Sequence, residues 1–158
     1  MGASPEPGAT APAFSLPSSA GGKVKLSDFK GRPVVVYFYP KDDTPGCTIE
    51  AKGFQAHAAA FQKAGVPVVG ISPDSVESHC GFAEKYGLDF ALLSDEKHAV
   101  AEKYGVWVEK NMYGKKYWGV QRSTFLIDKN GKIANVWPKV KPEGHAEAVL
   151  EAIAELSP

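Results

Sequence analysis

The segment PKDDTPGCTIE, residues 40–50, places a cysteine directly after residues that commonly begin helices. Thr44 suits the N-cap position and Pro45 the first helical position, so Cys47 is expected in the first turn. The N–H groups of a first turn have no helical partner, and the helix dipole puts about half a positive charge there. Both features favour a thiolate over a thiol. Because the thiolate is the reactive form of cysteine, the spacing predicts a nucleophile.

The alternative for Cys47 is a buried structural cysteine, which is common among free thiols. Two features favour the reactive interpretation. The cysteine follows a strand and its loop, where open α/β sheets place their sites. The polar loop residues Lys41, Asp42 and Asp43 are also expected to keep the thiol near solvent.

The apolar pattern predicts alternating strands and helices. Residues 34–39, VVVYFY, are β-branched or aromatic throughout, which is typical of a strand buried on both faces. An apolar stripe at spacings of three and four predicts a helix from Pro45 to about Ala64, ended by Gly65. Further strands are expected at 66–72, 89–95, 121–128 and 132–138, the last two joined by a turn at Asn130-Gly131, and further helices at 75–87, 96–105 and 143–156.

The order is β-α-β-α, then an inserted strand and helix, then β-β-α. This is the order of a thioredoxin-like fold, an α/β architecture in which helices flank a mixed central sheet. Residues 13–26 read as two short extended pieces around a Gly-Gly turn, which would form an N-terminal β extension. A length of 158 residues favours one domain, residues 1–158, with residues 1–12 as a loose lead-in.

Composition excludes several classes of function. The chain carries 18 basic and 18 acidic residues and no basic run, so nucleic acid is not an expected partner. No stretch approaches the length of a membrane span, and the N-terminus lacks the features of a signal peptide. Two cysteines and four scattered histidines form neither a disulfide framework nor a zinc motif. We therefore expect a cytoplasmic protein with no metal and no cofactor.

Six ordered segments resemble the peroxiredoxins. The family pattern Pro-x-x-x-Thr-x-x-Cys is matched by Pro40, Thr44 and Cys47. The segments ISPDSVESH, FAEKYGL, LLSD, MYGKKYWG and RSTFLIDKNG are similar, in the same order, to the bacterioferritin comigratory protein subgroup, also called the Q type. The resemblance extends from about residue 8 to residue 155.

The resemblance implies an enzyme that reduces hydroperoxides, with Cys47 as the peroxidatic cysteine that becomes a sulfenic acid. Thr44 would hydrogen-bond the sulfur and the bound peroxide, and Arg122 would stabilise the thiolate and polarise the substrate. Pro40 would shield the thiolate from water. Gly46, Thr44 and Arg122 would form the substrate-binding set, in which the N–H groups of Gly46 and Cys47 contact the peroxide.

The second cysteine, Cys80, is the expected resolving residue. Many members of the subgroup carry a cysteine five residues after the first, but that position is Lys52 here. Resolution by Cys80 would give an intramolecular disulfide that thioredoxin reduces, and it would require the helix start at Cys47 to unwind. The alternative is that Cys80 is a small core residue beside Val76 and Ala83, in which case an external thiol resolves Cys47. The subgroup contains monomers, the expected state here, and also dimers.

Other functions are disfavoured by residues near the first cysteine. A thioredoxin-type reductase needs Cys-x-x-Cys, and a copper-handling relative needs Cys-x-x-x-Cys, but Glu50 and Ala51 occupy those positions. A non-enzymatic holdase remains the alternative from another class. Glu50 is either a partner of Arg122 or a solvated helix residue, and it lies outside the expected catalytic set.

Overall fold

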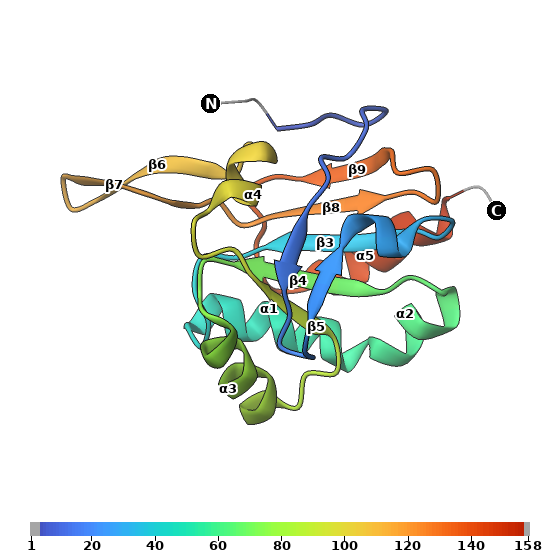
Figure 1. Cartoon of the computed structure of the whole chain (residues 1–158), viewed down its shortest axis with the longest axis horizontal. Helices are drawn as coiled ribbons and strands as arrows, with labels where there is room; N and C mark the ends of the chain where they lie inside the picture. The colour runs from blue at the N-terminus through green and yellow to red at the C-terminus, as the bar shows by residue number, and fades with distance from the viewer. Residues whose placement is uncertain (1–3, 157–158) are drawn as a thin grey trace.

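A computed structural model describes residues 4–156 and contains a five-stranded central sheet (Figure 1). The strand order is β5-β4-β3-β8-β9, with β3, β4 and β5 parallel and with β8 antiparallel to both β3 and β9. The bounds are Val34–Phe38 for β3, Val68–Ser72 for β4, Ala91–Ser94 for β5, Ser123–Ile127 for β8 and Ile133–Trp137 for β9. The predicted thioredoxin-like fold with a mixed sheet is confirmed.

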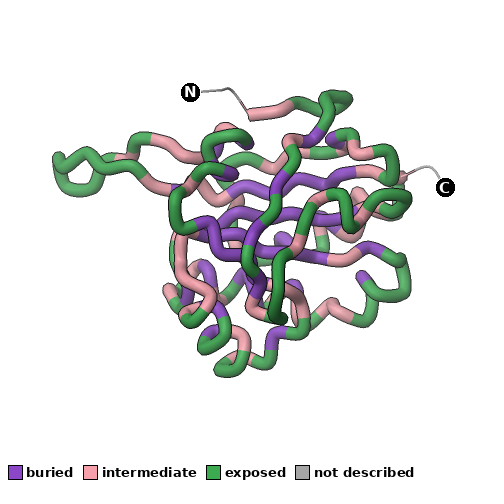
Figure 2. Tube along the Cα trace, in the orientation of Figure 1, coloured by how far each residue is buried: buried purple, intermediate pink, exposed green. Residues whose placement is uncertain are grey.

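Two hydrophobic clusters cover the two faces of the sheet. Strand β3 shows why, because its successive side chains alternate between the faces. Val34, Val36 and Phe38 belong to one cluster, and Val35 and Tyr37 belong to the other. Figure 2 shows the central strands as the most continuously buried part of the trace.

Different elements pack on each face. The cluster that contains Val35 is completed by four helices: α1 Pro45–Ala56, α2 Ala58–Ala64, α3 Val76–Tyr86 and α5 His145–Ala154. The opposite cluster is completed by α4 Ala99–Lys103, by the hairpin of β1 Ser15–Pro17 and β2 Lys23–Lys25, and by the 3-10 turn Leu26–Phe29. The four-helix face therefore carries both segments that hold cysteines.

The predicted helix from Pro45 to Ala64 is wrong in one respect, because the structure divides it at His57. The backbone of His57 leaves the helical region with φ −104 and ψ 16, and its ring hydrogen-bonds Glu147 of α5 at 2.9 Å. Both α1 and α2 contact α5, so the break lets each half follow that helix. The predicted helix at 75–87 is confirmed as α3, with Ser75 as its N-cap and Gly87 at its end.

Residues 106–120, for which the sequence pattern predicted no element, form a second hairpin. Strands β6 Trp107–Met112 and β7 Lys115–Val120 pair antiparallel and project from the body of the protein (Figure 1). The turn residues Tyr113 and Gly114 both have positive φ, 54 and 81, as a two-residue hairpin turn of type I′ requires. The tip is exposed in Figure 2, which explains why no buried pattern marked it.

The expected lead-in contacts the β8–β9 hairpin. The amide of Gly8 donates to Ile133 O at 2.8 Å, and Ile133 N donates to Ala9 O at 2.8 Å. Ala11 is buried against the sheet. Residues 1–3 lie outside the described residues. Within residues 4–156, no helix is long and apolar enough to span a membrane.

Candidate active site

The first turn of α1 places Cys47 against the sheet. Thr44 is the N-cap residue with extended backbone, and Pro45 begins the helix. Cys47 is only 1% exposed and packs in the apolar cluster with Ala51 and Phe54, which follow it on the same helix stripe. The expectation that the loop keeps the thiol near solvent is therefore wrong. A position on the buried stripe of α1 outweighs the polar character of the preceding loop.

The helix start leaves donors beside the sulfur. The first intrahelical bond of α1 runs from Thr48 N to Thr44 O at 2.8 Å. The N–H groups of Gly46 and Cys47 precede it and have no helical acceptor. The hydroxyl of Thr44 does not cap the helix but donates to Lys41 O at 2.9 Å. Because its one hydrogen is used in this way, its lone pairs are free to accept a hydrogen bond.

Arg122 contacts the sulfur from the position just before β8, whereas the predicted strand 121–128 would have included it. Its Nη2 lies 3.4 Å from Cys47 Sγ, and its Nη1 donates to Glu50 Oε1 at 2.8 Å. A Cβ at Gly46 would come within 2.9 Å of Nη2, so a glycine is needed for this approach. Burial lowers the pKa of Arg122, but the negative charges of Glu50 and Cys47 raise it by more. The pKa of Arg122 therefore lies above its ordinary value.

Glu50 is a site residue that the sequence analysis left outside the catalytic set. It is 2% exposed, so the solvated-residue interpretation is wrong and the pairing with Arg122 is confirmed. Burial raises the pKa of Glu50 to about 7, although Arg122 opposes the shift. Its Oε2 has no hydrogen-bond partner among the described residues. The signal that could have identified it is its spacing, since residue i+3 lies on the same helix face as Cys47.

Two further elements border the site. Pro40 is half-buried in the segment that links β3 to α1. Lys110 of β6 lies within the electrostatic influence of the site, because burial and Arg122 lower its pKa while Cys47 raises it.

The structure does not join the two cysteines. Both are free, Cys47 buried and Cys80 exposed. Cys80 lies in the second turn of α3, and its Sγ is 3.5 Å from Ser19 O. The alternative of Cys80 as a small core residue is wrong, because the core position in that turn is held by the neighbouring His79, which is 0% exposed.

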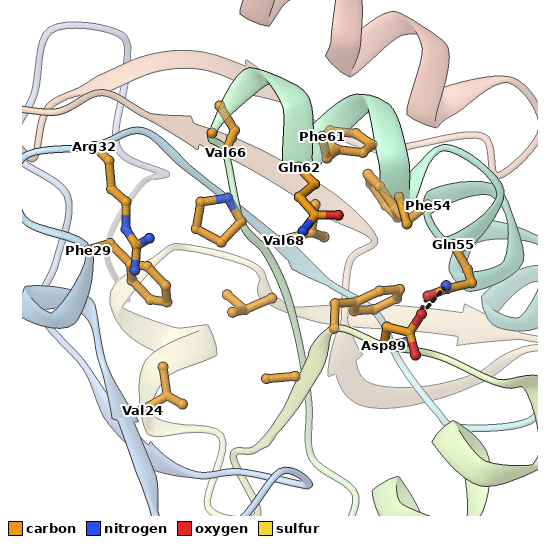
Figure 3. Close-up of a pocket in the computed structure, with 16 residues that line it drawn as sticks. Val24, Phe29, Arg32, Phe54, Gln55, Phe61, Gln62, Val66, Val68 and Asp89 are labelled. Atoms are coloured by element: carbon orange, nitrogen blue, oxygen red, sulfur yellow. Dashed lines mark hydrogen bonds between the residues drawn. The ribbon is translucent and has the colours of Figure 1, made fainter.

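An apolar cavity lies elsewhere in the described residues. It has a volume of about 600 Å³ and an apolar lining to which Phe54 and Phe61 contribute, with Arg32 at its border (Figure 3). Neither Cys47 nor Arg122 lines it.

The sequence profile of the AhpC/TSA family matches residues 7–136. Among curated proteins, a putative peroxiredoxin bcp of Coxiella burnetii is 55% identical over 145 residues, covering 92% of this chain and 96% of the relative. Peroxiredoxin Bcp of Bacillus subtilis is 46% identical over 152 residues, covering 96% and 97%.

Solved structures give the same picture. A crystal structure of a Xylella fastidiosa PrxQ mutant superposes with a TM-score of 0.91 at 37% identity, covering 97% of this chain and 98% of that one. A bacterioferritin comigratory protein of Xanthomonas campestris, studied for its alkyl peroxide reduction activity, gives a TM-score of 0.85 at 45% identity, covering 89% and 90%.

Proposed function

The chain belongs to the AhpC/TSA family as a peroxiredoxin of the Bcp or Q type, and on this premise we propose that it reduces hydrogen peroxide and organic hydroperoxides at Cys47. The observation that carries the proposal is the contact of Arg122 Nη2 with Cys47 Sγ at 3.4 Å, at the start of a helix. A cation thus contacts the sulfur in a helix first turn, whose N–H groups have no helical acceptor.

In the proposed reaction the Cys47 thiolate attacks the terminal peroxide oxygen. The S–O bond forms as the O–O bond breaks, so sulfur is oxidised to sulfenic acid and the leaving oxygen departs as water or an alcohol after taking a proton. Arg122 and the N–H groups of Gly46 and Cys47 stabilise the charge that develops on oxygen. Thr44 accepts a hydrogen bond from the peroxide, and Pro40 limits the access of water.

Resolution is proposed to use Cys80. Its thiolate attacks the Cys47 sulfenic sulfur, the S–S bond forms, and the hydroxyl leaves as water after gaining a proton. Cys47 is buried within α1 while Cys80 is exposed on α3, and a disulfide needs Cα atoms within about 7 Å. The proposal therefore includes unwinding of the first turn of α1, which would release the buried sulfur toward α3. A thioredoxin dithiol then reduces the disulfide and returns both thiols.

Two cysteine variants test the proposal. With thioredoxin, its reductase and NADPH, the Cys47→Ser variant should consume no peroxide. The Cys80→Ser variant should still form one sulfenic acid per chain but should lose turnover with thioredoxin. Mass spectrometry of the wild-type protein after one equivalent of peroxide should detect a Cys47–Cys80 disulfide. Full turnover without Cys47 would exclude the reaction, and absence of that disulfide would instead indicate resolution by an external thiol.

We further propose that the enzyme acts in the cytoplasm as a monomer. A thiol peroxidase that is recycled by a dithiol reductant needs a reducing compartment. Size-exclusion chromatography with light scattering would measure a mass near 16.9 kDa for the monomer, whereas a value of twice that mass would indicate a dimer.

A further inference from the structure

The loop between β3 and α1 is bound to α3 by two consecutive aspartates. Asp42 is buried. Its Oδ2 accepts a hydrogen bond from Ser78 Oγ at 2.8 Å and also lies 2.7 Å from His79 Nδ1. Asp43 is exposed and pairs with Lys85 near the other end of α3 at 2.7 Å. The two contacts lie on either side of Cys80 along that helix.

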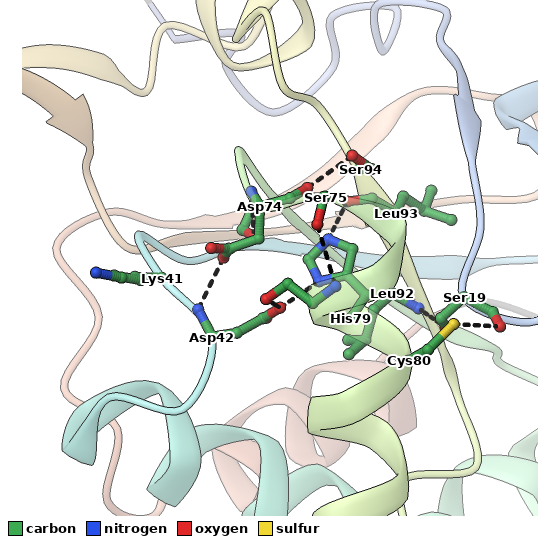
Figure 4. Close-up of polar contacts among 12 residues, drawn as sticks. Ser19, Lys41, Asp42, Asp74, Ser75, His79, Cys80, Leu92, Leu93 and Ser94 are labelled. Atoms are coloured by element: carbon green, nitrogen blue, oxygen red, sulfur yellow. Dashed lines mark hydrogen bonds and ion pairs between the residues drawn. The ribbon is translucent and has the colours of Figure 1, made fainter.

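The buried contact is fully hydrogen-bonded (Figure 4). The second oxygen of Asp42, Oδ1, accepts from the Tyr39 hydroxyl at 2.6 Å, and the Asp42 amide donates to Asp74 Oδ2 at 2.8 Å. His79 Nε2 lies 2.9 Å from Leu93 O. A carbonyl can only accept, so Nε2 carries a hydrogen, and one further hydrogen lies between Nδ1 and Asp42.

These bonds also account for a cluster that resembles a metal site. The ligand atoms of Asp42, Asp74 and His79 lie within 4.8 Å of one another. Each residue already has protein partners, and a cation would have to replace them. The cluster is better explained as a connection between the active-site loop and α3.

The position of this connection relates it to both cysteines. Asp42 precedes Cys47 by five residues in the loop that leads into α1, and His79 directly precedes Cys80. We propose that the Asp42–His79 contact is a latch that holds the loop and α3 in the peroxide-reactive arrangement and must open before Cys47 and Cys80 can join. The proposal rests on the two-cysteine mechanism proposed above. It makes both residues positioning residues for the resolution step.

The latch has a chemical consequence for Cys47. While it is closed, the sulfenic acid waits beside Arg122 and can meet a second peroxide. Its sulfur would then attack that peroxide and become a sulfinic acid, as the peroxide is reduced to water or alcohol. A weaker latch should therefore speed disulfide formation and reduce the fraction of sulfinic acid at a given peroxide concentration.

Two substitutions of His79 separate its two bonds. Asparagine places an amide donor near the position of Nδ1 and would keep the bond to Asp42. Glutamine reaches the position of Nε2 and would keep the bond to Leu93 O. The His79→Gln variant should therefore open the latch, whereas the His79→Asn variant should keep it. Asp43→Asn is the matched control, because it removes the charge from an exposed ion pair between the same loop and the same helix.

The assay is a single turnover with one equivalent of hydrogen peroxide. Rapid quenching with a thiol alkylator and mass spectrometry would separate sulfenic acid formation from disulfide formation. The His79→Gln variant should form the disulfide about tenfold faster with sulfenic acid formation unchanged, and the His79→Asn and Asp43→Asn variants should stay within about twofold of wild type. Equal acceleration in both His79 variants, or none in His79→Gln, would overturn the latch.

Hydrogen exchange of residues 41–48 and 75–80 in the reduced protein gives a second readout. The amides of both segments should exchange faster in His79→Gln than in His79→Asn, and equal exchange would contradict the proposal. This readout also applies if the wild-type protein forms no disulfide. In that case the two-cysteine mechanism fails while the latch is still judged by exchange. If a His79 variant does not fold, Ser78→Ala removes the other α3 donor to Asp42 and should increase exchange and disulfide formation to a smaller extent.

Discussion

Replacing Glu50 by glutamine should remove a loss of stability that the wild-type protein undergoes as the pH rises. Burial raises the pKa of Glu50 from 4.5 in the unfolded chain to about 7 in the folded protein. The folded state therefore binds the proton more tightly. The contribution of protonated Glu50 to the free energy of unfolding is fully present below pH 4.5 and is lost as the pH rises through about 7. The shift corresponds to about 3 kcal/mol of unfolding free energy, at about 1.4 kcal/mol for each pH unit.

Glutamine keeps the size of the side chain and cannot ionise. At pH 5 the variant should exceed the wild type in stability by no more than about 1 kcal/mol, because Glu50 has begun to ionise in the unfolded chain but is still protonated in the folded state. At pH 8 the Glu50→Gln variant should be more stable than the wild type by about 3 kcal/mol, since the wild type must hold a buried carboxylate with one unpartnered oxygen. The ion pair with Arg122 is already included in this value, because it lowers the pKa that burial raises.

The measurement is urea denaturation at pH 5, 6, 7 and 8 with both cysteines reduced. The quantity of interest is the difference in unfolding free energy between variant and wild type, because other titrating groups cancel in it. A difference that stays constant across this range would show that Glu50 does not titrate there. A difference that falls with pH would mean that pairing with Arg122 outweighs burial.

Three further substitutions test other contacts of the site and core. The Gly46→Ala variant should slow peroxide reduction about tenfold with little change in unfolding free energy, because the new Cβ would displace Arg122; unchanged kinetics would show that Arg122 need not lie so close. The Tyr37→Phe variant should gain about 1 kcal/mol in urea denaturation, because the buried hydroxyl has no partner among the described residues. His145 is buried against Thr124, and burial followed by Arg122 lowers its pKa from 6.5 to about 4. The folded state thus favours the neutral ring, so the contribution of His145 to stability is lost as the pH falls from 6.5 to 4. In urea denaturation the wild type should therefore become less stable relative to the His145→Gln variant over this range, because the contribution of Glu50 is common to both proteins.

The fold could be predicted where sequence and burial share one simple pattern. Strand β3 is apolar throughout and buried on both faces, and α3 has both of its end signals, Ser75 and Gly87. Hairpin β6–β7 lacked such a pattern because it projects from the body and buries little. The division at His57 was also hidden, since it depends on α5, which lies 90 residues further along the chain.

The candidate site was predicted unevenly for a similar reason. The position of Cys47 at a helix start follows from the residues beside it. The contact with Arg122, 75 residues away, was expected only from the family resemblance. Asp42 had no local signal at all, because a loop with two aspartates reads as solvated. Its burial depends on donors that converge from Tyr39, directly after β3, and from α3.

The burial of Cys47 has opposite effects on the two steps of the proposed cycle. Desolvation strengthens the interaction of the thiolate with Arg122 and excludes water from the peroxide site, which assists the first step. The same burial separates Cys47 from the exposed Cys80, which opposes the second step. One rigid structure cannot serve both steps, so the chain needs contacts strong enough to hold the reactive arrangement and weak enough to open in each turnover. Asp42 meets this requirement, because its bonds to Ser78 and His79 join the active-site loop to α3 and are not part of the backbone pairing of the sheet.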